Sequence, residues 1–201
     1  MKVYKFLDEL ASSSPAPGGG SASALLCSIG ASLVCMVCRL TIGKKGYEQS
    51  EAELKKVLEE AETLRKNAEK LIDEDAVVFK EVMNAYKTPK ENPERQNIIQ
   101  NALRKATLTP IEVAKIGVRV LDLSKIAAFK GNVNSITDAG VAALAAEAGV
   151  RGAVLNAKIN LRSMKDDMQK GELLSELGGL DERSKTTLNE IYNIITFKLN
   201  S

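Results

Sequence analysis

Hydrophobic residues recur at helical spacing along almost the whole chain, and no segment shows the sustained alternation expected of a strand. Residues 47–86 contain no glycine or proline, which predicts one unbroken helix about 60 Å long. Its apolar stripe has coiled-coil-like spacing, which favours long antiparallel packing or dimerisation. The stripe consists of Leu54, Val57, Leu58, Ala61, Leu64, Ala68, Leu71, Ile72, Asp75, Phe79, Val82 and Tyr86. The pattern therefore predicts an all-α protein, a bundle of long antiparallel helices.

The remaining helices are located by their turn and capping residues. They are predicted at 3–10, 21–38, 110 to about 129, 138 to about 164, and 181–199, and Asn92-Pro93 predicts one further helix start. We expect Ser21 to cap the second helix and Asp181 to cap the last. Thr109 and Glu112 form a capping box around Pro110. All 201 residues are assigned to one helical domain.

The segment from Ser21 to Cys38 carries no charged residue. Because a membrane span needs roughly 20 apolar residues, a spanning helix has to be considered. The segment is, however, rich in small residues rather than in Leu, Ile and Phe. A seam of small side chains lets a neighbouring helix approach closely, and here it consists of Ala24, Ser28, Ala31, Cys35 and Cys38. We interpret the segment as a buried core or interface helix, and we expect no membrane association.

The composition excludes several classes of function. With 28 Lys and Arg against 26 Asp and Glu, the net charge of +2 argues against general binding to nucleic acid. The absence of histidine excludes a Ser-His-Asp triad and a histidine-ligated metal. Acid–base chemistry must then use Asp, Glu, Lys, Cys or Tyr.

The three cysteines, Cys27, Cys35 and Cys38, also bear on the chemistry. Cys35 and Cys38 have the spacing of a redox or zinc motif, but there is no second pair and both lie in the apolar segment. They are better explained as small core residues, and no metal site is predicted. Because three cysteines cannot form a disulfide framework and no signal peptide is recognisable, we expect a cytoplasmic, reduced protein.

Three groups of polar or flexible residues are candidates for binding. Gly18, Gly19 and Gly20 precede a helix start and either form a plain turn or leave backbone open to a ligand. The segment containing Asn132, Asn134 and Asp138 either caps a helix or presents a carboxylate to a ligand. Asn156 and Asn160 lie four residues apart on one helix face, where they bind a heteroaromatic ligand or cross-link helices.

The first 46 residues carry an excess of positive charge, including Arg39, Lys44 and Lys45, which suits a small polyanion as well as a solvated surface.

Asp75 stands out because it occupies a position in the apolar stripe, whereas Asp73 and Glu74 fall on the solvent side. A carboxylate on an apolar face is costly unless it has a partner, and such groups often have adjusted proton affinities. A salt bridge to a facing helix or a local break in the stripe would explain it equally well.

The same segments resemble the cyclodeaminase/cyclohydrolase family, which includes the C-terminal module of formiminotransferase-cyclodeaminase. The resemblance extends over nearly the whole chain. It is carried by residues 6–11, by Pro15-Ala16-Pro17-Gly18-Gly19-Gly20-Ser21, by Thr41-Ile42-Gly43-Lys44-Lys45 with Tyr47, by Asp75 with Phe79, by Gly131-Asn132 with Asn134 and Asp138, and by Asn156 with Asn160-Leu161. Gly46 and Ala157 depart from the residues expected at their positions.

The resemblance implies an all-helical homodimer that acts on a tetrahydrofolate derivative as substrate, with no permanently bound cofactor. The implied reaction converts 5-formiminotetrahydrofolate to 5,10-methenyltetrahydrofolate and ammonia, and the alternative is hydrolysis of the methenyl compound. These 201 residues hold no formiminotransferase module, so functional coupling to a separate formiminotransferase is expected. A helical interaction protein without catalysis is the alternative of another class.

This chemistry needs proton transfer without histidine and stabilisation of a cation. We therefore hypothesise that Asp75 transfers protons and that Asp138 stabilises the cation or orients the pterin, assisted by Asn132 and Asn134. The glutamate tail would meet Arg39, Lys44 and Lys45. The folate would lie against the backbone from Gly18 to Ser21.

Overall fold

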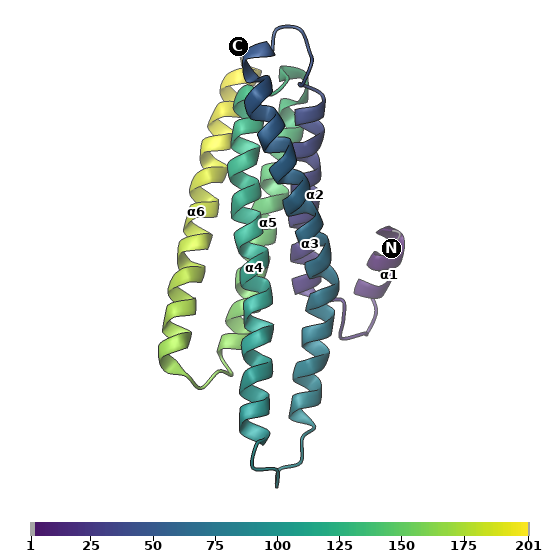
Figure 1. Cartoon of the computed structure of the whole chain (residues 1–201), viewed down its shortest axis with the longest axis vertical. Coiled ribbons are helices and arrows are strands. Elements are labelled where there is room, and N and C mark those ends of the chain that lie inside the picture. The colour runs from purple at the N-terminus through teal and green to yellow at the C-terminus, as the bar shows by residue number, and fades with distance from the viewer. Residues whose placement is uncertain (1–2, 201) are drawn as a thin grey trace.

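Six α-helices and two short 3-10 helices make up the protein, and no strand occurs within residues 3–200, which this computed structural model describes. The elements are α1 (Val3–Leu10), α2 (Gly19–Arg39), η1 (Glu48–Ser50), α3 (Glu51–Tyr86), α4 (Arg95–Lys130), η2 (Val133–Ser135), α5 (Ile136–Leu161) and α6 (Asp167–Leu199). The long helices α2 to α6 run alternately up and down along one axis (Figure 1). The predicted all-α bundle of long antiparallel helices is therefore confirmed.

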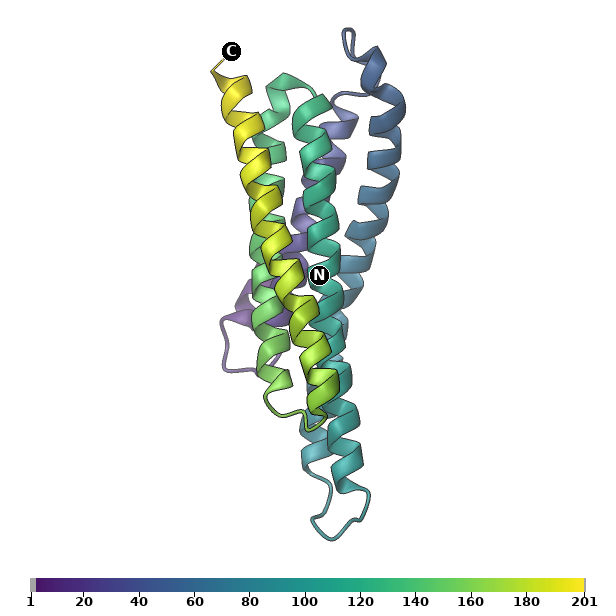
Figure 2. The same cartoon turned by 90° about the vertical axis from the view of Figure 1, so that its left-hand side faces the viewer.

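Helix α4 is the centre of the bundle, because it packs against α2, α3, α5 and α6. Helices α2 and α5 also pack directly against each other. The hairpin of α3 and α4 extends well beyond the loop that joins α5 to α6 (Figure 2). The lower part of this hairpin therefore has fewer neighbours than the middle of the bundle.

Small residues allow α2 to approach its neighbours, as the seam in its sequence predicts. A Cβ atom on Gly149 of α5 would lie 2.6 Å from the sulfur of Cys27, and one on Gly30 would lie 2.8 Å from the carbonyl oxygen of Ala142. Among residues 3–200, α2 is the helix that is long and apolar enough to cross a membrane, and 61% of its most apolar window is buried in the bundle. This burial supports the interpretation of α2 as a core helix.

The cysteines are buried, unpaired and packed into this core. Burial raises the pKa of the Cys27 thiol to about 12 and that of Cys38 to about 12. The pKa of Cys35 rises to about 11, mainly through burial and further through the nearby Glu62 carboxylate. Thiols of this kind stay protonated at neutral pH and do not act as nucleophiles.

Four predicted helix starts are wrong. The start predicted at Asn92-Pro93 lies before α4, which begins at Arg95 with Glu94 as its N-cap, and the other three lie inside helices. Helix α4 runs without interruption from Arg95 through Pro110, so Thr109 and Glu112 lie inside a helix rather than at its start. Helix α6 begins at Asp167, and its N-cap is Asp166, whose carboxylate accepts from the backbone of Gln169. Helix α2 begins at Gly19, which puts Ser21 in the first turn rather than at the cap.

These errors have a common physical cause, which is that local capping signals also serve tertiary roles. Asp181 makes an ion pair with Lys185 one turn later in α6, and Ser21 binds a side chain of another helix. Helix α1 forms over Val3–Leu10 as predicted, but it buries little of its apolar surface. Phe6 is buried, whereas Val3 and Leu7 are 71% and 52% exposed.

Candidate active site

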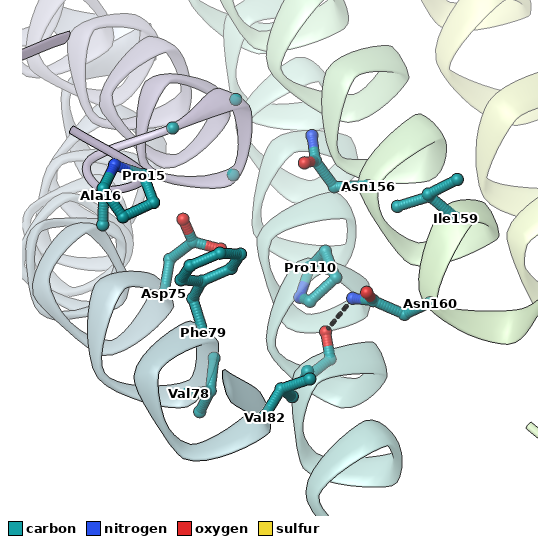
Figure 3. Close-up of a pocket in the computed structure, with 14 residues that line it drawn as sticks. Pro15, Ala16, Asp75, Val78, Phe79, Val82, Pro110, Asn156, Ile159 and Asn160 are labelled. Carbon is teal, nitrogen blue, oxygen red and sulfur yellow. Dashed lines mark hydrogen bonds between the residues drawn. The ribbon is translucent and has the colours of Figure 1, made fainter. Parts of the chain in front are cut away.

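A cavity of about 320 Å³ opens between the start of α2, the last third of α3, the middle of α4 around Pro110 and the last turns of α5 (Figure 3). Six of the residues singled out in the sequence line it: Gly18, Gly19, Gly20, Asp75, Asn156 and Asn160. They come from segments as far apart as residues 18 and 160, so the fold creates this grouping. The cavity is the candidate active site.

Asp75 is held at the start of α2 by Ser21. The backbone N–H of Ser21 donates to Oδ2 of Asp75 at 2.8 Å, and the Ser21 hydroxyl lies 3.0 Å from the same oxygen and 2.9 Å from the carbonyl oxygen of Ile72. The first turn of a helix carries unpaired N–H groups and a partial positive charge, which stabilise an anion placed there. No salt bridge to Asp75 occurs within residues 3–200, so the N-terminus of α2 takes the place of the facing Lys or Arg that the sequence allowed.

Both contacts from Ser21 go to Oδ2, which leaves Oδ1 to other partners. Gly20 makes this arrangement possible, because a Cβ atom at that position would lie 2.0 Å from Oδ1 of Asp75. The glycine therefore allows the carboxylate to lie against the backbone of α2. The side chain of Asp75 extends into the cavity from α3 (Figure 3).

The two asparagines lie on the opposite wall, and both amide nitrogens are used within the protein. Nδ2 of Asn156 donates to the carbonyl oxygen of Gly152 at 2.8 Å, and Nδ2 of Asn160 donates to that of Ala106 at 2.7 Å. The carbonyl of Ala106 is available because Pro110, four residues later in α4, has no N–H to give it. Asn160 thus supplies the missing donor, which explains why α4 continues through a proline.

The rest of the cavity is apolar. Val78, Phe79 and Val82 contribute from α3, and Pro110 and Ile159 contribute from α4 and α5. Phe79 and Pro110 lie on opposite sides of the cavity (Figure 3). A flat ring with polar edges fits a space that has apolar walls and a few fixed polar groups.

A second group of predicted site residues lies at the other end of the bundle, where α2 ends and α5 begins. The backbone N–H of Asn132 donates to the hydroxyl of Thr41 at 2.8 Å, and the Tyr47 hydroxyl accepts from the backbone of Val133 at 3.0 Å. The side chain of Asn132 accepts from the backbone of Asn134, which fixes this loop. Asp138 is half-buried in the first turn of α5.

The three basic residues predicted to meet the glutamate tail are also at this end. Lys44 and Lys45 are exposed, and the ammonium of Lys44 lies 5.8 Å from the centre of the Tyr47 ring. Arg39 donates to Glu62 at 2.6 Å. Hydrogen bonds from Arg39 and then Arg65 lower the pKa of Glu62 to about 2, so Arg39 already has an anionic partner within the chain.

Within one chain, the structure therefore separates the predicted site into two groups. The cavity contains Asp75, the glycines and the later asparagine pair. The distal group contains Arg39, Lys44, Lys45, Asn132, Asn134 and Asp138. Ala106 and Pro110 also line the cavity, although neither was predicted as a site residue. A proline inside a long apolar stretch of helical spacing is the signal that could have indicated a backbone carbonyl in need of a partner.

Comparisons with known proteins decide the family. The family model described as Formiminotransferase-cyclodeaminase matches residues 2–178. The chain belongs to this family. The resemblance recognised in the sequence is thereby confirmed.

Two kinds of relative within the family carry different names. The methenyltetrahydrofolate cyclohydrolase of Methylorubrum extorquens is 46% identical over 98% of this chain and 97% of its own length. The formimidoyltransferase-cyclodeaminase of Mus musculus is 31% identical over 90% of this chain. The matched region makes up 34% of the length of the mouse protein.

A solved structure shares the fold. The crystal structure of formiminotetrahydrofolate cyclodeaminase from Thermotoga maritima matches with a TM-score of 0.92 and 27% identity, covering 99% of this chain and 98% of that one. Family, relatives and fold together identify the chain as an enzyme of the folate cyclodeaminase and cyclohydrolase group.

Proposed function

We propose that this protein is a methenyltetrahydrofolate cyclohydrolase, and that the reaction takes place in the cavity beside Asp75. The observation that carries the site is the fixed Asp75 carboxylate, which lines the cavity and has one oxygen anchored by Ser21 at the start of α2 while the other takes no hydrogen bond from Ser21. The choice of reaction is supported by the 46% identity to a relative of that name over almost both full lengths.

The proposed chemistry uses Asp75 as the proton-transfer group. Water adds to the carbon between N5 and N10 of the methenyl cation while Oδ1 of Asp75 takes one of its protons. The C–N5 bond then breaks as this proton passes to N5, and the hydroxyl proton leaves to solvent. The products are 10-formyltetrahydrofolate and one proton. An anionic carboxylate also favours the cationic substrate electrostatically.

The cyclodeaminase reaction is the second candidate, supported by the shared fold and 27% identity with the enzyme from Thermotoga maritima. Here N10 attacks the formimino carbon on N5, and ammonia leaves with a proton supplied through the same carboxylate. Its substrate would come from a separate formiminotransferase. In both reactions the folate enters as a substrate, with no permanently bound cofactor.

A homodimer is part of this proposal, because one chain holds the predicted site in two separate groups. Exposed apolar side chains line the outer faces of the two helices that pack against each other: Ile29 and Met36 on α2 with Leu40 at its C-cap, and Val141, Leu144, Leu155 and Ile159 on α5. A second copy docked antiparallel on this face would bring its distal group towards the cavity of the first. Lys44, Lys45 and Asp138 would then act across the interface, on the glutamate tail and the pterin.

A two-substrate assay tests the proposed function. Purified protein is given 5,10-methenyltetrahydrofolate, and the loss of its absorbance is compared with the uncatalysed rate. The same protein is then given 5-formiminotetrahydrofolate, and ammonia release is followed. Accelerated methenyl loss without ammonia release supports the cyclohydrolase. Ammonia release in step with methenyl formation would replace it by the cyclodeaminase, and no acceleration of either would contradict the enzyme assignment.

A further inference from the structure

The wall of the cavity formed by α5 carries two amide oxygens, of Asn156 and Asn160, that accept no hydrogen bond within residues 3–200. Nδ2 of Asn156 and Nδ2 of Asn160 each donate to a backbone carbonyl oxygen. A carbonyl oxygen only accepts, so the nitrogen of each amide must face it and the oxygen must point elsewhere. Each amide keeps a second N–H, but one of its two donors is already used, whereas the whole accepting capacity of Oδ1 remains for a ligand in the cavity that both asparagines line.

For Asn160 this orientation is built into α4. Pro110 leaves the carbonyl of Ala106 without its helical partner, and a buried or half-buried carbonyl without a donor is costly. Turning the Asn160 amide over would place two acceptors against each other. Pro110 therefore acts as a positioning residue that fixes which end of the Asn160 amide faces the ligand.

The amide oxygens of Asn156 and Asn160 come from positions one helical turn apart. Together they can accept from two donors along the edge of a ring rather than from a single atom. Residues four apart on a helix have Cβ atoms about 5–6 Å apart, and both side chains extend to the same side of α5 (Figure 3). Phe79 faces this region from α3, and Ile159 lies between the two asparagines in sequence. A flat ring that enters between these apolar groups presents its edge to the asparagines.

We propose that Asn156 and Asn160 recognise the N–H edge of the pterin ring, the 2-amino group and the adjacent N3–H, and that Pro110 sets the orientation of the Asn160 amide. This proposal rests on the proposed folate function. It leaves Asp75, on the facing wall, to the reacting carbon. The asparagines thereby determine specificity for a 2-aminopterin over a ring that lacks the 2-amino donor.

The binding test uses 5-formyltetrahydrofolate, which is not turned over by either proposed reaction, and its 2-desamino analogue. We expect the wild-type protein to bind the analogue about tenfold more weakly, because an acceptor is left unpaired. The ratio of the two dissociation constants should fall towards one in Asn156→Leu, in the double variant Pro110→Ala/Asn160→Leu, or in both. The control Asn101→Leu, exposed on α4 outside this cavity, should keep the wild-type ratio.

A wild-type ratio near one, or a ratio unchanged in both asparagine variants, would overturn the proposal while leaving the folate function in place. Failure of the wild-type protein to bind 5-formyltetrahydrofolate would overturn the proposal and the folate function together. The formyl group carries no N–H, so discrimination with this ligand is assigned to the pterin and not to a formimino group.

A stability cycle tests the role of Pro110 without any ligand. Asn160→Leu should lower the melting temperature while Pro110 is present, because the carbonyl of Ala106 then has no donor. In the Pro110→Ala background the same change should cost much less, since the new backbone N–H pairs with that carbonyl. An equal loss in both backgrounds would show that Asn160 is not held by the gap in α4, and would overturn the positioning role.

Discussion

At the scale of single residues, the close approach of Gly20 to Asp75 is the most restrictive contact of the site. A Cβ atom at Gly20 would lie 2.0 Å from Oδ1 of Asp75, well inside contact distance. We predict that Gly20→Ala displaces the carboxylate and lowers kcat about 100-fold or more, the range that loss of a positioned acid or base produces. Steady-state kinetics measure this.

A matched glycine provides the control. Gly178 lies within α6, and a Cβ atom there would meet nothing within 4 Å. Gly178→Ala should leave kcat unchanged and stabilise the helix by about 0.5–1 kcal/mol. Equal activity in the two alanine variants would mean that Asp75 does not depend on Gly20.

The cysteines give a residue-scale prediction about reactivity. With pKa values of about 12, 11 and 12 in the folded protein, Cys27, Cys35 and Cys38 carry very little thiolate at pH 8. Iodoacetamide should therefore label the native protein at least about 100-fold more slowly than the urea-unfolded chain. Mass spectrometry over time measures this, and rapid native labelling of Cys35 or Cys38 would argue for a reactive thiol instead.

These raised pKa values also set the alkaline limit of stability. A group whose pKa is higher in the folded state stabilises the fold fully below its ordinary value of 9.0, and this contribution is lost as the pH rises towards 12.

Some residue roles follow from sequence and others do not. Asp75 is conspicuous because it interrupts an apolar stripe, and the structure places it in the cavity. Its partner Ser21 has the sequence context of a helix cap, and only the packing of α2 on α3 shows that it binds Asp75. The roles of Ala106 and Pro110 depend on Asn160, which is 50 residues away from Pro110, and local spacing cannot reveal such a contact.

At the scale of elements, the attachment of α2 to α3 depends partly on Glu62. This carboxylate pairs with Arg39 at 2.6 Å and with Arg65 at 2.9 Å, and its pKa falls from 4.5 to about 2. A depressed pKa means that the stabilisation is complete above pH 4.5 and is lost as the pH falls towards 2. We predict that Glu62→Gln is less stable than wild type at pH 7 and that the difference shrinks between pH 4.5 and 3.

Urea unfolding at pH 7, 4.5 and 3 measures that difference. Glu59→Gln serves as the control, because Glu59 is exposed on the same helix and takes part in no ion pair within residues 3–200. A deficit in Glu62→Gln that stays constant across the three pH values would contradict the ion-pair explanation.

Element types were easier to predict than element ends. The long helix predicted at 47–86 corresponds to η1 and α3, because forty residues without glycine or proline leave few alternatives. The end points failed where a local signal competes with tertiary contacts. Pro110 looks like a helix start, yet the donor from Asn160 lets α4 continue through it. Asp181 looks like a helix cap, yet it lies inside α6, which begins at Asp167 and packs on α4 and α5.

At the scale of the whole molecule, the two separated groups of site residues and the exposed apolar stripes of α2 and α5 lead to the same expectation, an antiparallel dimer. We predict that Leu144→Glu, which places a charge on a stripe residue that is 44% exposed, yields a folded monomer with little activity. Light scattering coupled to size exclusion measures the mass, and circular dichroism measures the helix content.

Val77→Glu is the control for this variant, because Val77 is 53% exposed on α3 and lies outside both stripes. It should keep the wild-type mass and activity. A wild-type protein that is monomeric and fully active would contradict the need for a second copy. The sequence predicted the family and the bundle, but a single chain's pattern does not state how two copies meet, and this part of the account depends on exposure in the folded structure.

The central claim is that the Asp75 carboxylate in the cavity at the start of α2 performs the folate chemistry. Its most direct test is the turnover of 5,10-methenyltetrahydrofolate by Asp75→Asn, with binding of 5-formyltetrahydrofolate measured on the same preparation. Asparagine keeps an oxygen for the N–H of Ser21 but cannot accept the proton, so we predict at least about a 100-fold loss in kcat with nearly unchanged binding. Near-normal turnover with normal binding would contradict the claim.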